Sequence, residues 1–391
     1  MRVPTVDSRS IPGVRIRWHS SSEREAAAGV WKALETRVGG DALACSWDWT
    51  EVWLEHYGDL VPHRFAVGEI DGVACGITLV TRSVGRRRGP FRVRSVHLGT
   101  AGEPPGDSVF VEYNRTLVAP DLRRDFAAAL IDELRDEGDW HELVIDGFAP
   151  EEAEPYLLAE PLLVPRRMIC PVMDLRVVGS GDGDGTVLAA LKYPVRKKIR
   201  RSLKALGEVE TEWARTPDHA LDILTELTEL HQRRWTAVGE PGAFASERFA
   251  GFHRDLVPRL LPGGGVILFR VRASAGTVGC LYAFVERSRV LAYQTGFASF
   301  PDRMIRPGFV VLAACMQECF EQGLIEFDHQ VGDTRYKREL STTTRELVWA
   351  TGRRPRLRWR LMDGLAAAKR KLGRDSGFGH EPGAEQLTEG P

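Results

Sequence analysis

The sequence predicts an α/β protein (layered α+β) of two tandem domains, each with a mixed central sheet flanked by helices. The main observation is an internal repeat: a hairpin, a strand, a helix and a further strand occur in the same order in both halves of the 391 residues. In both copies the helix ends at a glycine, Gly138 and Gly323, and the next strand ends in an aspartate, Asp146 and Asp328. A duplicated domain is the most economical explanation, and the length suits two to three domain-sized units.

Composition and cysteine usage narrow the class of protein. The chain is 43% hydrophobic and 27% charged, which excludes a wholly disordered or fibrous protein. The N-terminus lacks the apolar core of a signal peptide, and the longest apolar run, at 309–315, is far short of the ~20 residues of a spanning helix. Scattered cysteines without a CxxC motif favour reduced, structural thiols and no metal: Cys45, Cys75, Cys170, Cys280, Cys315 and Cys319. We therefore expect a cytoplasmic protein without a transmembrane segment.

Charge is unevenly distributed, although the formal net charge is only -1. Residues 1–165 hold 18 Lys and Arg against 27 Asp and Glu, whereas the remaining residues hold 35 against 27. The second half is therefore the one suited to a phosphate-bearing ligand.

The first half is predicted as an N-terminal domain at 13–175, after a loose leader at 1–12. A short strand at 14–18 precedes a helix at 21–37, which begins with serine and carries glutamates in its first turn. The next predicted helix carries an aromatic cluster, interpreted as an aromatic core or, alternatively, as a ligand wall: Trp47, Trp49, Trp53 and Tyr57.

A hairpin follows at 63–81, because Asp71-Gly72 separates two runs that alternate apolar residues. A basic connector at 82–94 is expected to be a solvated loop. Further on, we predict a strand at 109–118, a helix from Pro120 to about Gly138 and a strand at 142–148.

The second half is predicted as a C-terminal domain at 176–352, which opens with a Gly/Asp-rich break at 178–185. A strongly basic helix at 193–206 either presents a solvated cationic face or lies near a phosphate-bearing ligand. Asp218 is the expected N-cap of the next helix. The predicted hairpin strands are 265–272 and 277–286, a strand follows at 345–351, and we expect a basic helix at 353–372 and a disordered tail at 373–391.

The most informative stretch is 289–339. A strand at 290–295 leads into a turn-rich loop with two basic residues and Gly308, then a helix that ends at Gly323 and a strand at 324–328. Backbone N–H groups at a helix N-terminus, together with cationic side chains, favour anion binding, and phosphates especially.

These elements, over 20–340, resemble the tandem GNAT architecture of the FemAB-like acyltransferases. Four motifs of the second half carry the resemblance: LKYPVRKKIRRSLKAL at 191–206, HQRRW at 231–235, YQTGF followed by RPGFVVLAAC at 293–315, and FDHQVGDTRYK at 327–337. The resemblance implies a GNAT fold and an acyltransferase activity. The first half is expected to be a degenerate copy that forms a wall of the acceptor cleft.

By this resemblance an acyl thioester lies in a split between two parallel strands, and its pyrophosphate sits on the loop that leads into the following helix. The residues so assigned to the donor are Tyr293, Gln294, Arg303, Arg306, Gly308 and Lys337. The loop departs from the usual GNAT signature, an Arg or Gln two residues ahead of Gly-x-Gly or Gly-x-Ala, because it has one glycine. Acyl-CoA, with acetyl-CoA first, is the expected co-substrate; aminoacyl-tRNA is the alternative, since FemAB-like relatives include enzymes that use it.

The implied reaction is attack of an amine on a carbonyl, which needs a proton acceptor, oxyanion donors and a leaving-group acid. We predict Asp328 and His329 for proton transfer, Tyr336 as the leaving-group acid and the backbone N–H groups of 292–294 as oxyanion donors. A strand-end cap, a core histidine and a packing tyrosine are the structural alternatives for the three side chains. The predicted acceptor-side residues are Tyr193, Lys197, His231, Arg234 and Trp235.

The sequence therefore predicts an N-acyltransferase that modifies an amine of a small molecule, a sugar or a peptide-like acceptor such as a peptidoglycan or polysaccharide precursor. Two alternatives stay open: an aminoacyl-tRNA-dependent transferase, with tRNA as partner, and a non-catalytic GNAT-like scaffold in polysaccharide or natural-product assembly.

Overall fold

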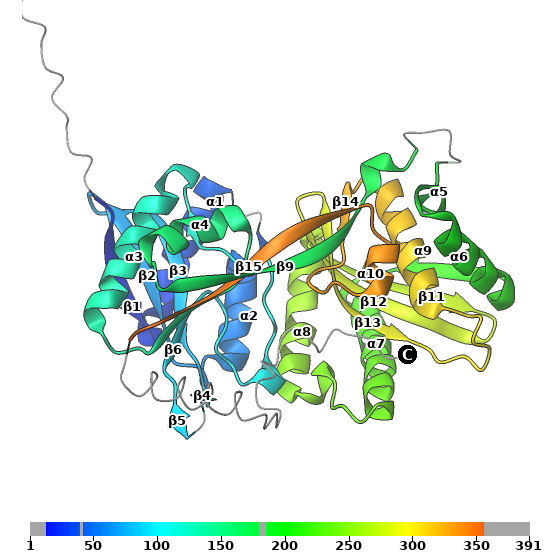
Figure 1. The fold of residues 1–391 in the computed structure, drawn as a ribbon, viewed down its shortest axis with the longest axis horizontal. Helices are drawn as coiled ribbons and strands as arrows, with labels where there is room; N and C mark the ends of the chain where they lie inside the picture. The colour runs from blue at the N-terminus through cyan, green and yellow to red at the C-terminus, as the bar shows by residue number, and fades with distance from the viewer. Residues whose placement is uncertain (1–12, 40–41, 89, 180–184, 356–391) are drawn as a thin grey trace, which may run out of the picture.

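The computed structural model describes residues 13–39, 42–88, 90–179 and 185–355. The predicted leader, most of the predicted C-terminal helix and the predicted tail lie outside the described residues. A continuous mixed sheet runs through both halves in the order β1-β2-β3-β6-β8-β15-β9-β14-β13-β12-β11-β10, with β7 paired to β3 (Figure 1). No helix in the described ranges is long and apolar enough to cross a membrane.

In the described ranges the first half contributes seven strands to this sheet: β1 (Arg15–Ser20), β2 (His63–Ile70), β3 (Val73–Arg82), β6 (Ser95–Leu98), β7 (Leu117–Val118), β8 (Glu142–Phe148) and β9 (Leu163–Asp174). The short strands β4 (Arg87–Arg88) and β5 (Phe91–Arg92) pair with each other. The helices of this half are α1 (Arg24–Val38), α2 (Trp47–Tyr57), α3 (Arg123–Glu137) and α4 (Pro150–Ala159).

The second half has the strands β10 (Val209–Trp213), β11 (Val266–Ala273), β12 (Gly276–Glu286), β13 (Arg289–Phe297), β14 (Glu326–Asp328) and β15 (Thr343–Arg353). Its helices are α5 (Val187–Ala190), α6 (Tyr193–Leu206), α7 (Pro217–Ala237), α8 (Glu247–Leu260), α9 (Pro307–Glu321) and α10 (Arg335–Glu339). Thr216 caps α7, where the sequence favoured Asp218, because the Thr216 hydroxyl accepts the His219 N–H.

The predicted repeat is confirmed, with one strand misassigned. The hairpins β2-β3 and β11-β12 correspond, and so do the parallel pairs β6/β8 and β13/β14. The strand predicted at 109–118 is wrong except for its last two residues, and β6 takes its place in the sheet. The run is apolar enough to suggest a strand, but Phe110 and Tyr113 have φ of 43° and 54°, which take the backbone out of the extended region.

The two halves exchange strands. β9 and β15 pair antiparallel through ten residue pairs, from Thr343↔Val172 to Gly352↔Leu163. β15, from the end of the described chain, also pairs with β8 of the first half, while β9 pairs with β14 of the second. The predicted ranges 13–175 and 176–352 are therefore joined by a shared two-strand ribbon at the centre of the sheet (Figure 1).

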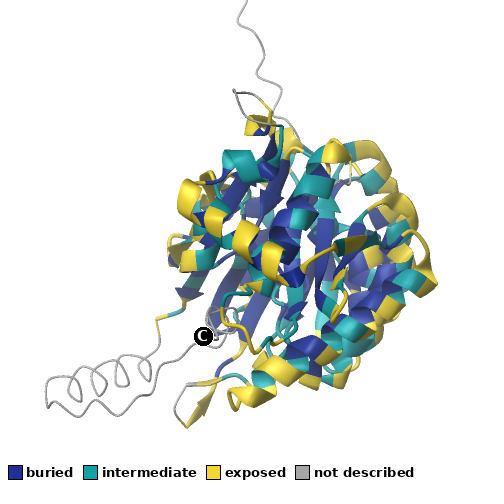
Figure 2. Ribbon diagram, turned by 90° about the vertical axis from the view of Figure 1, so that its right-hand side faces the viewer, coloured by how far each residue is buried: buried dark blue, intermediate teal, exposed yellow. Residues whose placement is uncertain are grey.

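The core lies between the sheet and its covering helices, whose outer faces carry the exposed residues (Figure 2). The aromatic cluster of α2 belongs to this core, as one of the two interpretations predicted: Trp47, Trp49, Trp53 and Tyr57 are all buried. Trp49 packs edge-on against Phe252 of α8, with ring centroids 5.0 Å apart. A continuous apolar cluster therefore links the halves, which fixes the relative position of residues on either side of the interface.

At Gly296 the strand β13 passes close to α7. A Cβ on Gly296 would lie 2.5 Å from the Leu227 carbonyl oxygen and 2.9 Å from Leu230 Cβ. We expect Gly296→Ala to lower the free energy of unfolding by about 1–3 kcal/mol, since the helix backbone must shift. Urea unfolding measures this. Gly265→Ala is the control, because its nearest neighbour would be at an ordinary 3.4 Å; equal losses in the two variants would contradict the prediction.

Candidate active site

The parallel strands β13 and β14 pair only from Arg289↔Glu326 to Leu291↔Asp328. Among the described strands, none continues this pairing along 292–297, so the sheet is split at that point. The β12-β13 register shifts between the pairs Tyr282↔Gln294 and Ala283↔Ala292, so that Tyr293 is an extra, bulged residue. The split and the bulge expose the backbone of β13 next to a pocket.

The corresponding split of the first half, between β6 and β8, is filled by the protein's own chain. Asn114 donates its backbone N–H to Gly147 O at 3.0 Å and its Nδ2 to Leu98 O at 2.8 Å. The segment before it, residues 108–113, extends to the second half, where Tyr293 Oη donates to Val109 O at 2.7 Å. The first half therefore supplies a wall to the site of the second.

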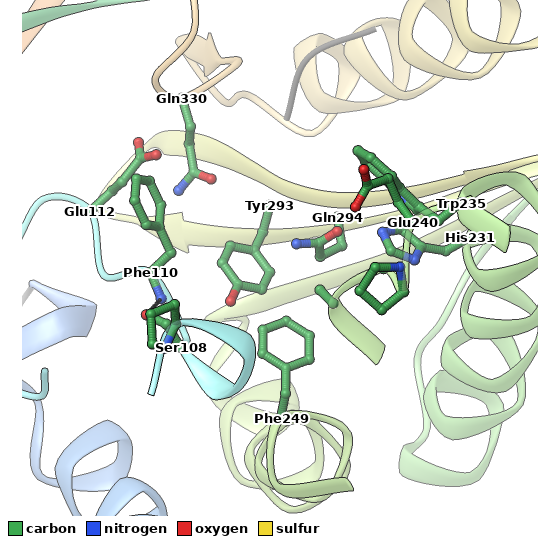
Figure 3. Close-up of a pocket in the computed structure, with 14 residues that line it drawn as sticks. Ser108, Phe110, Glu112, His231, Trp235, Glu240, Phe249, Tyr293, Gln294 and Gln330 are labelled. Carbon is green, nitrogen blue, oxygen red and sulfur yellow. Dashed lines mark hydrogen bonds between the residues drawn. The ribbon is translucent and has the colours of Figure 1, made fainter. Parts of the chain in front are cut away.

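The lining of the pocket comes from both halves (Figure 3), and its outline contains about 760 Å³ of empty space, part of which is open solvent. Its aromatic lining consists of Phe110, Trp235, Phe249 and Tyr293. The polar groups include Glu112, His231, Gln294 and Gln330, while the exposed Glu240 lies at the opposite end from Glu112.

Glu112 is the carboxyl group buried in this wall, with 7% of its surface exposed. Its Oε2 accepts the Val331 N–H at 3.0 Å, whereas its Oε1 has no hydrogen-bond partner among the described residues. Burial raises the pKa of the Glu112 carboxyl to about 8, and the Asp328 charge adds to the rise. The Val331 N–H and Lys337 act in the opposite direction. A carboxyl with this pKa can exchange protons near neutral pH.

Lys337 and Asp328 lie buried behind Gln330. The Lys337 ammonium donates to Val331 O at 2.7 Å and Gln330 O at 3.2 Å, and burial lowers its pKa. Asp328 accepts from the Tyr113 hydroxyl and, at 2.7 Å, from the Gln330 N–H; burial raises its pKa. These bonds hold the segment that carries Gln330 and Val331 against Glu112.

Unfavourable backbone conformations are concentrated at this junction. Phe110, Tyr113 and Gln330 have φ of 43°, 54° and 57°, and they flank Glu112 and its partner Val331. Each such conformation costs about 1–3 kcal/mol and persists only where the surroundings impose it. The packing of the two halves thus determines the position of Glu112.

The structure places four of the predicted residues on the pocket wall: Tyr293, Gln294, His231 and Trp235. Burial lowers the pKa of His231 to about 4, so its ring is neutral at pH 7. The residues predicted for proton transfer lie outside the lining. His329 is buried with a pKa lowered to about 3, mainly by burial, and Tyr336 packs half-buried against the core of the second half.

The other predicted residues are spread around the site. Arg303 and Arg306 are exposed near the start of α9, and Tyr193, Lys197 and Arg234 are exposed away from the lining. A Cβ on Gly308 would lie 3.1 Å from the Phe297 ring, so this glycine makes room for a side chain of β13. The Arg306 N–H donates to Ser202 Oγ at 3.0 Å, and the N–H groups of Phe309 and Val310 donate to Arg306 O. Gly308 therefore carries the remaining backbone donor in this first turn.

Glu112 is the residue that sequence reasoning missed. It stands in the apolar run VFVEY, which was interpreted as a strand. The signal available in the sequence was a carboxylate inside that apolar run. Glu112 is 181 positions from Tyr293 in sequence, and the fold brings both residues to one pocket wall.

His253 fixes the position of Tyr293. Because Tyr293 Oη donates to Val109 O, it accepts from His253 Nε2 at 3.1 Å, and His253 Nδ1 accepts from Tyr282 Oη at 3.1 Å. This pattern needs a neutral ring, and burial lowers the His253 pKa from 6.5 to about 3. The unfolded state therefore takes up a proton first as pH falls. The stability that neutral His253 supplies is complete above pH 6.5 and declines below it.

We expect the difference in unfolding free energy between the natural protein and His253→Gln to shrink by about 1.4 kcal/mol per pH unit below pH 6.5. Urea unfolding of both proteins at pH 5, 6, 7 and 8 measures it. The subtraction cancels the contributions of the buried carboxyls. A difference that stays constant from pH 5 to pH 8 would rule out a neutral, buried His253.

Comparison with known sequences identifies a domain in the second half. The family described as acetyltransferase (GNAT) domain matches residues 192–338, from the start of α6 through most of α10. None of the curated protein sequences compared with the chain matches it.

Solved structures resemble nearly the whole chain in fold. FemX is 11% identical, with a TM-score of 0.53, and the match covers 89% of this chain and all of FemX. L-PGS from Bacillus licheniformis is 13% identical at a TM-score of 0.52, covering 88% of this chain and 97% of that one. The C-terminal domain of a putative lysylphosphatidylglycerol synthetase from Agrobacterium fabrum is 11% identical at 0.52, covering 88% and 96%.

Proposed function

We propose that this chain, which has a GNAT acetyltransferase domain in its second half and the GNAT-superfamily acyltransferase fold throughout, is an N-acyltransferase with its acceptor site in the pocket between the halves. The observation that carries the proposal is Glu112: a buried carboxyl with one oxygen that no described residue hydrogen-bonds, in a pocket wall next to the split of β13 and β14. An amine entering this pocket meets a proton acceptor beside the strand that binds the acyl group in this superfamily.

The proposed chemistry uses groups of both halves. Glu112 takes a proton from the acceptor's ammonium, and the neutral nitrogen then attacks the acyl carbonyl carbon. The C–N bond forms while the carbonyl oxygen becomes negative, and the N–H groups at the bulge of β13 are the proposed oxyanion donors. The C–S bond then breaks, and the second proton on nitrogen passes to the departing sulfur. The products are the amide and the free thiol. Asp328 and Lys337 act as positioning residues for the segment opposite Glu112.

Acyl-CoA is the proposed donor, with acetyl-CoA first, and the predicted loop retains its role in the proposal. Arg303 and Arg306 are exposed beside α9 and have no ion-pair partner among the described residues, so both can meet a pyrophosphate. The basic face of α6 lies next to α9, tied to it by Ser202, whose hydroxyl accepts the Arg306 N–H.

The test is acyl transfer from radiolabelled acetyl-CoA, and from longer acyl-CoAs, to a library of amines, sugars and peptides, with calorimetry of CoA binding. Turnover with an amine supports the proposal. Absence of both CoA binding and turnover contradicts it. Binding of CoA without turnover of any acceptor would favour the scaffold alternative.

An aminoacyl-tRNA-dependent transferase is the second candidate, favoured by the exposed cations of α6 and its N-cap: Lys192, Lys197, Arg200, Arg201 and Lys204. A run of such cations binds a nucleic acid backbone. Transfer of a labelled aminoacyl group that ribonuclease treatment abolishes would establish this candidate, and would contradict acyl-CoA as the donor.

A further inference from the structure

Resting on the proposed function, we infer that the acceptor is a primary amine that arrives as a cation on an apolar or aromatic body, and that the pocket excludes phosphorylated and carboxylated acceptors. The charge of the lining, its aromatic surface and the unpartnered oxygen of Glu112 carry this inference.

The ionisable lining groups are acidic. Glu112 and Glu240 lie at opposite ends of the pocket (Figure 3), and no lysine or arginine is among the lining residues that the structure describes. His231, the remaining titratable group of the wall besides Tyr293, is buried and neutral. The Lys337 ammonium lies behind Gln330 and donates to two carbonyls, so it cannot pair with an anionic ligand without losing them. A phosphate here would be desolvated without a cation, which is strongly unfavourable.

Aromatic rings line the space between the carboxyl groups of Glu112 and Glu240. Tyr293 and Phe249 lie at its centre, with Phe110 toward Glu112 and Trp235 toward Glu240 (Figure 3). The rings are fixed by stacking: Phe249 on Tyr293 with centroids 6.4 Å apart, and Phe110 on Trp349 at 5.8 Å. Aromatic faces attract ammonium groups by about 0.5–2 kcal/mol and bind apolar bodies, so a cation with such a body matches this lining.

Binding of an ammonium has a proton signature at Glu112. The groups that face this carboxyl include the Asp328 carboxyl, the Lys337 ammonium, the Cys170 thiol, the Tyr293 hydroxyl and the Val331 N–H. Since the pKa of Glu112 is raised to about 8, the carboxyl holds a proton at pH 7, and an arriving ammonium displaces it. One proton is then released per amine bound near pH 7, and affinity for the amine rises with pH up to about 8.

The experiment is titration calorimetry without an acyl donor, using 2-phenylethylamine, 2-phenylethanol and 3-phenylpropanoate as probes. We expect the amine to bind at least about tenfold tighter than the alcohol, which corresponds to about 1.4 kcal/mol, and the carboxylate to bind most weakly. Repeating the amine titration at pH 7 in buffers of different ionisation enthalpy should show proton release. Equal affinity for the three probes, including no measurable binding of any, would overturn the inference.

Two isosteric variants remove the same charge from opposite ends of the pocket. Glu112→Gln should abolish proton release and the preference for the amine, whereas Glu240→Gln, which is exposed and screened, should cost about threefold or less. Thermal unfolding checks that both variants are folded. An intact preference in folded Glu112→Gln contradicts the inference. The titrations contain no acyl donor, so they test the inference separately from the proposed function. Equal binding of the probes together with acyl transfer to an amine would contradict the inference alone. A preference for the amine without any acyl transfer would contradict the proposed function alone.

Discussion

Replacing Glu112 by glutamine is expected to lower kcat for acylation of an amine by about 10²–10⁴-fold, the contribution typical of a general base. The glutamine amide fills the same space and still accepts the Val331 N–H, but it cannot take a proton from the ammonium. Steady-state kinetics with acetyl-CoA measure the change, and KM for the donor should stay close to its natural value because Glu112 lies on the acceptor side.

The pH profile separates this role from a structural one. In the natural protein kcat/KM should rise with pH and level off above about pH 8, where the Glu112 carboxyl has lost its proton. This rise should be absent in the variant. Glu112→Asp, which retains a carboxylate, should restore part of the rate. A variant with unchanged kcat, or with the same pH profile, would exclude Glu112 as the base.

The second large effect is expected for Lys337→Met. This change leaves the carbonyls of Gln330 and Val331 without their donor and removes the cation that faces Glu112 and Asp328. Breaking a buried charge arrangement of this kind costs about 3–5 kcal/mol. We expect a loss of about 3 kcal/mol in the free energy of unfolding, measured by urea denaturation at pH 8.

Lys198→Met is the matched control. Lys198 pairs with Glu339 at 2.6 Å, but 38% of its side chain is exposed, so its loss should cost about 1 kcal/mol or less. Comparable losses in the two variants would show that the Lys337 ammonium does not neutralise the buried carboxylates.

The elements that sequence predicted well are those specified by local signals. The helix at 193–206 carries Pro194 in its first turn and Gly207 after its last, and the structure has it with these bounds. The hairpin turn at Asp71-Gly72 has φ of 51° and 77°, as such a dipeptide indicates. The resemblance to tandem GNAT proteins rested on the order of such elements, and the matching family and folds confirm it.

The site itself depended on contacts that no local pattern encodes. Residues 109–113 contain β-formers, but Asn114 fills the first split and Phe110 stacks on Trp349, so the chain crosses to the other half with positive φ at two aromatic residues. Glu112 becomes basic only because this crossing buries it. Asp328 and His329 lie at the end of β14 and outside the pocket lining, where Gln330 takes the wall position.

The position of β15 has a consequence for how the protein folds during synthesis. Strand β8 of the first half needs a neighbour that lies 211 residues later, as the Glu142–Arg353 ion pair shows. Pairing across such a separation is slow, and an unpaired strand edge is prone to aggregation in the meantime. The first half therefore cannot complete its sheet on the ribosome until almost the whole described chain has emerged. Arrested nascent chains that end before Thr343 should accordingly be more sensitive to protease in their first half than chains that include β15.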